Sequence, residues 1–194
     1  LYSKEVIDFL IERRDRGDGV PKIFLEGNHE RGMLDYMEDP FSPYGSAWLD
    51  WGGMETMNSY GLHFEAGVML PGEREESARR LREILPQSHW EFLNALQLTA
   101  VIGDYAFVHA GVDPYSPLDR QKATDLRAVR EPFLNWHRHK DYKPLRYKIV
   151  HGHTVSEEPE NLPHRIGVDT GLWKGGVLTA AVLEGEQVRF LQVS

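Results

Sequence analysis

Three apolar segments of this chain each run into a histidine with glycine nearby, and this repeat constrains the fold more than any other feature. The segments are residues 23–30 (Ile-Phe-Leu-Glu-Gly-Asn-His-Glu), 108–111 (Val-His-Ala-Gly) and 150–154 (Val-His-Gly-His-Thr). A short apolar run bounded by turn residues is typical of a buried strand. Polar residues just beyond such strands are placed to bind or react. Three such strand tips predict one edge of a sheet in an α/β protein.

The first tip combines a possible ligand with a possible catalyst. We expect a strand over residues 20–25, after which Gly27 lets the backbone turn. Asn28 offers a carbonyl oxygen to a hard cation, and the imidazole of His29 can act as an acid or a base. An ordinary polar turn is the alternative, because Asn tolerates positive φ and loops are rich in polar residues.

The other two tips leave choices open. His109 could be a buried structural histidine at the end of a hairpin over residues 100–108. His151 and His153 are two residues apart, which puts both on the same face of an extended segment, so either could be a ligand.

Composition narrows the class of protein. The chain has 194 residues, of which 41% are apolar, and this predicts one globular domain over residues 1–194. The net charge of −8 argues against nucleic-acid and membrane partners. Without Cys, any metal must bind His, Asn or carboxylates. No apolar run approaches the roughly 20 residues of a membrane span and no signal peptide is recognisable, so we expect a cytoplasmic protein.

Four motifs in order resemble those of the calcineurin-like metallophosphoesterases, and most of all the bacterial and phage phosphoprotein (serine/threonine) phosphatases. They are Gly27-Asn28-His29-Glu30, His109-Ala110-Gly111, Gly152-His153-Thr154 and Asp169-Thr170-Gly171. The resemblance implies an α/β/β/α sandwich of two mixed sheets flanked by helices.

The resemblance also implies roles for individual residues. Metal ligands would be Asn28, His109 and His153, and His29 would be the catalytic general acid. Arg130 would bind the substrate phosphate, with Arg127 as the competing position. Asp169 would support the site, and His151 would lie behind the ligands.

The cofactors implied are two divalent metal ions, manganese first, with iron or zinc as alternatives. They would activate a hydroxide for direct attack on the phosphorus of a phosphoprotein or small phosphoester.

One departure from the family pattern is large. The D-x-H and G-D-x-x-D-R-G motifs, which supply the remaining metal ligands, do not occur in full. Asp15-Arg16-Gly17 lacks the preceding Gly-Asp and follows the first predicted helix, so we interpret this match as chance. We expect these motifs and the N-terminal strands to precede Leu1, and little activity from the 194 residues alone.

Three functional hypotheses follow. The first is a serine/threonine protein phosphatase, and the second is a symmetrical dinucleoside tetraphosphate hydrolase built on the same site. Glu30 favours the first, since the hydrolases more often have Asp there. The third is a catalytically incomplete phosphate-binding pseudoenzyme.

Local patterns give further expectations about the elements. Ser3 is placed to cap a first helix, and Ser88 with Glu91 has the form of a capping box. Residues 165–169, 177–183 and 188–193 are expected to form a closing β-meander.

Overall fold

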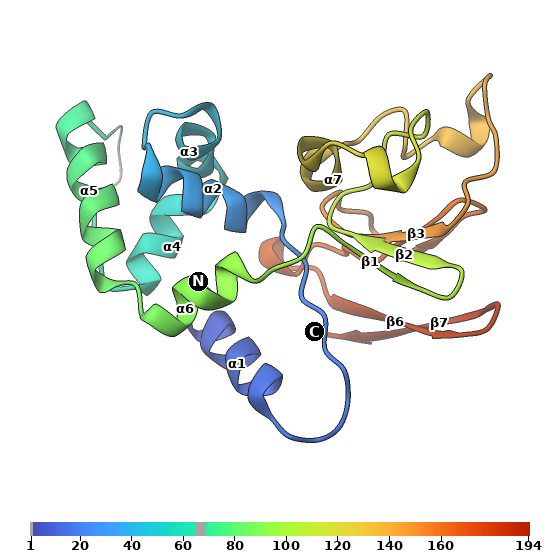
Figure 1. Cartoon of the computed structure of the whole chain (residues 1–194), viewed down its shortest axis with the longest axis horizontal. Coiled ribbons are helices and arrows are strands. Elements are labelled where there is room, and N and C mark those ends of the chain that lie inside the picture. The colour runs from blue at the N-terminus through green and yellow to red at the C-terminus, as the bar shows by residue number, and fades with distance from the viewer. Residues whose placement is uncertain (1, 65–68) are drawn as a thin grey trace. The chain divides into compact units, whose positions relative to one another are not determined.

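The computed structural model describes residues 2–64 and 69–194, and the chain forms two compact units, Leu1–Leu96 and Gln97–Ser194 (Figure 1). In the described chain the first unit is helical and the second carries all the named strands. The single domain expected over residues 1–194 stays a prediction. None of the described helices combines the length and the apolar composition that a bilayer-spanning helix needs.

The first unit is a set of helices around an apolar core. Met33, Leu34 and Met37 recur at helical spacing on α2 and are buried, together with Trp48 and Leu81. A π-helical turn over Leu49–Gly53 joins α3 to α4. The helices are α1 (Ser3–Asp15), α2 (Asn28–Glu38), α3 (Pro43–Trp48), α4 (Met54–Ser59), α5 (Pro71–Ile84) and α6 (Gln87–Asn94).

The strand expected over residues 20–25 does not form, and this prediction is wrong. Only Leu25 makes an isolated bridge, and Ile23 is 45% exposed. Pro21 explains the failure, because it has no N–H to donate to a neighbouring strand. Phe24 still packs, with its ring 5.1 Å from that of Phe92.

Both predicted helix caps are also wrong. The N-cap of α1 is Tyr2, and the Ser3 hydroxyl instead lies 3.3 Å from that of Thr56. Helix α6 begins at Gln87 with Pro86 as its N-cap, so Ser88 falls inside the first turn and caps nothing. Because the Pro86 ring already fixes a φ compatible with a helix start, the helix begins two residues before the place the pattern indicated.

The second unit contains a five-stranded mixed sheet in the order β1-β2-β3-β5-β4. β1 and β2 form the predicted hairpin, which is confirmed. β2, β3 and β5 run parallel, and β4 is antiparallel to β5. The α/β class with a mixed sheet flanked by helices is therefore confirmed. The strands are β1 (Thr99–Ile102), β2 (Tyr105–Val108), β3 (Lys148–His151), β4 (Glu160–Asn161) and β5 (Arg165–Gly167).

The last two strands form a separate antiparallel hairpin, β6 (Leu178–Glu184) and β7 (Gln187–Val193). The predicted meander is wrong, because β5 pairs with β3 and β4 instead. Tyr105 donates a hydrogen bond of 2.9 Å to the Gly185 carbonyl, which ties the hairpin turn to the mixed sheet. In the described residues the first sheet is mixed, as expected, and this second sheet is purely antiparallel.

Apolar residues from the mixed sheet and from the short helix α7 (Ala123–Ala128) form the core of the second unit. Ala106, Val108 and Ile149 project from the strands and are buried with Leu126 of α7 and with Phe133. Ala110 N–H donates to the Leu126 carbonyl at 2.8 Å. Helix α7 is thereby held next to the end of β2, where the candidate site begins.

Candidate functional site

Parallel pairing of β2 and β3 brings two of the predicted histidines together. The register opposes Phe107 with Val150, and beyond the strand ends the Gly152 N–H donates to the His109 carbonyl at 2.9 Å. His109 Nε2 consequently lies 3.2 Å from His153 Nδ1, with the ring centroids 5.1 Å apart. Two of the strand tips predicted from the sequence therefore do meet at one edge of the sheet.

A tight turn sets the direction of His153. Thr154 N–H donates to the Gly152 carbonyl at 2.7 Å, which closes a three-residue turn around His153 at φ +63°. This is the rarer, strained sense of the γ-turn, and a non-Gly residue there costs about 1–3 kcal/mol. Strain of this kind is characteristic of functional positions. The assumption that His151 and His153 share one face of an extended segment is wrong, because the chain turns at His153.

His151 is engaged elsewhere. Its side chain is 2% exposed, and its Nε2 faces Arg165 Nη1 at 3.3 Å. Because a guanidinium only donates, Nε2 is the acceptor and Nδ1 donates to the Gly152 carbonyl at 2.9 Å. Burial lowers the pKa of His151 to about 4. Both ring nitrogens thus serve the fold, and the structure places His153 rather than His151 beside His109.

Arg130 follows α7 and reaches the same segment. Its Nη1 donates to Thr154 Oγ1 at 3.0 Å, and the residue is exposed. Thr154 directly follows His153 in the chain, so the Arg130 guanidinium is hydrogen-bonded to the residue next to the histidine pair. The competing position, Arg127, lies on α7 itself. Sequence reasoning gave Thr154 no role, although a hydroxyl directly after His153 was the available signal.

Asp169 organises the loop next to the pair. Its carboxylate accepts the Gly171 N–H at 3.0 Å, and its carbonyl accepts the Ser156 N–H at 3.0 Å. These bonds join the segment after β5 to the segment that carries His153. This geometry is compatible with the supporting role that the resemblance implied.

The remaining predicted residues belong to the first unit. Asn28 opens α2 and is 6% exposed, whereas His29 is exposed with its ring 6.0 Å from that of Trp51. Glu30 accepts the Gly27 N–H at 2.8 Å and so closes the first turn of α2. The convergence of Asn28 and His29 with the histidine pair stays a prediction.

The histidine pair fits two ligands of one divalent cation. Two imidazole nitrogens bound at about 2.1 Å to one ion are separated by about 3.0–3.4 Å, which includes the observed 3.2 Å. A direct hydrogen bond also fits. The cation needs both facing nitrogens deprotonated, whereas the hydrogen bond needs one protonated and one deprotonated nitrogen. Within residues 2–64 and 69–194, no group of three or more His, Cys, Asp or Glu is placed to hold a metal. The pair therefore supplies only part of a coordination shell, and the metals remain proposals.

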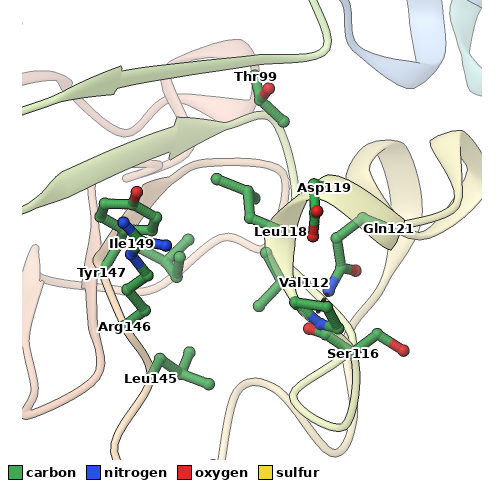
Figure 2. Close-up of a pocket in the computed structure, with 11 residues that line it drawn as sticks. Thr99, Val112, Ser116, Leu118, Asp119, Gln121, Leu145, Arg146, Tyr147 and Ile149 are labelled. Carbon is green, nitrogen blue, oxygen red and sulfur yellow. Dashed lines mark hydrogen bonds between the residues drawn. The ribbon is translucent and has the colours of Figure 1, made fainter.

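A cavity of about 420 Å³ lies elsewhere in the second unit (Figure 2). Leu118 and Val112 face Tyr147 and Ile149 across it. The Gln121 amide is committed to its own loop, because it donates to the carbonyls of Asp113 and Ser116 at 2.8 Å each. The cavity is lined by Thr99, Val112, Ser116, Pro117, Leu118, Asp119, Gln121, Leu145, Arg146, Tyr147 and Ile149. The five predicted site residues, Asn28, His29, His109, Arg130 and His153, are not among them.

Among solved structures, the chain is similar to one described as "Crystal structure of a putative diadenosine tetraphosphatase". The TM-score is 0.57 at 19% identity, and the match covers 95% of this chain and 71% of that chain. At this identity the likeness shows the fold alone. No family model and no curated protein matches the sequence.

Proposed function

We propose that this protein is a metal-dependent phosphoester hydrolase. The observation that carries the proposal is the 3.2 Å approach of His109 Nε2 to His153 Nδ1, with the Arg130 guanidinium bound to the next residue, Thr154. A cation-binding pair beside a planar cationic donor suits a tetrahedral anion such as a phosphate ester.

Each residue has a distinct proposed role. His109 and His153 would hold a divalent cation, with the Asn28 carbonyl oxygen as a further ligand. The bound cations would supply an activated water and neutralise phosphate charge. Arg130, oriented by Thr154, would bind the non-bridging phosphate oxygens. His29, which is exposed, would donate a proton to the leaving oxygen.

Two substrate classes have support. The order of the four motifs favours a phosphoserine or phosphothreonine protein. The likeness to a structure described as "a putative diadenosine tetraphosphatase" favours a dinucleoside tetraphosphate. Glu30 no longer separates them, because its carboxylate closes the first turn of its own helix and so has a structural reason to be present.

A side-by-side assay tests the proposal on the protein in its full natural length. With Mn²⁺ we expect hydrolysis of p-nitrophenyl phosphate, and loss of this activity with EDTA and in His109→Ala and Arg130→Ala. Exposed His63 supplies the control variant, His63→Ala, which should keep the parent rate. A phosphoserine peptide and diadenosine tetraphosphate then identify the substrate class. Absence of hydrolysis of all three compounds would favour the pseudoenzyme.

A further inference from the structure

An exposed tryptophan lies in the turn between β5 and β6. Trp173 is 74% exposed and sits at the centre of a 3₁₀ turn over Leu172–Lys174. The turn is bracketed by Gly171 at φ +72° and Gly175 at φ +92°, a backbone region that favours glycine. The local sequence therefore fixes the turn with the indole at its tip.

This turn is packed against the segment that carries the site. A Cβ at Gly171 would lie 2.9 Å from Val155 Cγ1, so the backbone there approaches the residue after Thr154 closely. Asp169 accepts hydrogen bonds from Gly171 and Ser156 and ties the same two segments together. The backbone that leads into the Trp173 turn is thus held beside the segment that carries His153 and Thr154.

A second cation accompanies the indole. The Lys174 stem lies over Gly171, with Cε 3.0 Å from the position a Cβ would take, and Nζ is 5.8 Å from the centroid of the Trp173 ring. Arg130 and Lys174 therefore both present positive charge near the 153–155 segment of a chain with net charge −8. An aromatic face combined with two cations suits a ligand that has both a planar ring and several phosphates.

We propose that Trp173 and Lys174 form a nucleobase-binding platform, in which the indole stacks on the base and Lys174 contacts an additional phosphate. The platform rests on the proposed function and deepens it, since it selects nucleoside polyphosphates over phosphoserine peptides. A phosphoserine residue brings no ring of its own to the indole.

Equilibrium binding without divalent metal tests the platform independently of hydrolysis. The probes are diadenosine tetraphosphate, which has bases, and tripolyphosphate, which has none, measured by calorimetry in EDTA. We expect Trp173→Ala to weaken binding of diadenosine tetraphosphate about tenfold and to leave tripolyphosphate binding unchanged. Trp173→Phe should restore most of the affinity, because it keeps an aromatic face.

Trp90→Ala is the matched control, since Trp90 is also exposed but lies on α6 of the first unit. It should bind both probes as the parent does. Failure of the parent to bind diadenosine tetraphosphate, or equal binding by Trp173→Ala, would overturn the platform while leaving phosphoesterase activity possible. Ring-dependent binding by a protein that hydrolyses no phosphoester would instead overturn the proposed function.

Discussion

Acidification should destabilise the second unit through His164, a buried histidine outside the candidate site. Its Nε2 donates to the Phe133 carbonyl at 2.8 Å, and its ring stacks on His137 with centroids 5.3 Å apart. The His164 Nδ1 is buried and finds no hydrogen-bond partner among the described residues. A proton added there would lie in a site that offers it no acceptor.

Burial lowers the pKa of His164 to about 4 from its ordinary 6.5, and the nearby charge of Arg165 acts in the same direction. His137 also lowers this pKa, whereas Glu160 and the bond to Phe133 oppose the shift. The unfolded chain therefore takes up the proton first as the pH falls. The contribution to stability is complete above pH 6.5 and is lost progressively toward pH 4.

At pH 5 this difference reduces the free energy of unfolding by about 2 kcal/mol relative to neutral pH. Urea unfolding across pH 7.5 to 4.5 measures it. His164→Gln cannot titrate but can donate a similar hydrogen bond, so its stability should fall about 2 kcal/mol less than the parent's between pH 7.5 and pH 5.

The matched control is His63→Gln, which removes an exposed imidazole. An unchanged pH dependence in His164→Gln, or an equal change in the control, would refute the reasoning that burial of His164 is the cause.

Three further variants test other parts of the structure. Arg130→Lys should lower kcat/KM for p-nitrophenyl phosphate about tenfold, because Lys lacks the planar pair of donors. Steady-state kinetics measure this change, and a parent-like kcat/KM would contradict the prediction. Gly111→Ala would place a Cβ 2.3 Å from the Phe133 ring and should cost about 1–3 kcal/mol in thermal unfolding. His89→Ala removes the 2.8 Å bond to Asp8 and should destabilise the first unit by about 2 kcal/mol, which denaturant titration would reveal.

The pattern of apolar residues correctly predicted the strands that bury apolar side chains in the core of the second unit. The hairpin β1-β2 and the strand before His151 follow from short apolar runs with turn residues between them, and the structure contains them. These predictions held because burial of a periodic face is a local property of the sequence.

Predictions that needed backbone detail did not hold. A run of apolar letters indicated a strand over residues 20–25, but Pro21 removes a donor from it and Ile23 stays exposed. Residue spacing could not decide whether His151 or His153 lies beside His109. The answer depends on the positive φ at His153 and on the hydrogen bond from Arg165 to His151. Turn geometry and long-range partners of this kind are not encoded in a residue pattern.

The pairing of His109 with His153 as cation ligands is the central claim, and Mn²⁺ binding tests it most directly. An electron paramagnetic resonance titration would compare the parent with His109→Ala and with His153→Gly. Glycine at 153 removes the imidazole and also relieves the strained φ, so loss of metal could not be attributed to unfolding. The claim predicts that both variants bind Mn²⁺ at least about tenfold more weakly than the parent. Parent-like Mn²⁺ binding in either variant would contradict it.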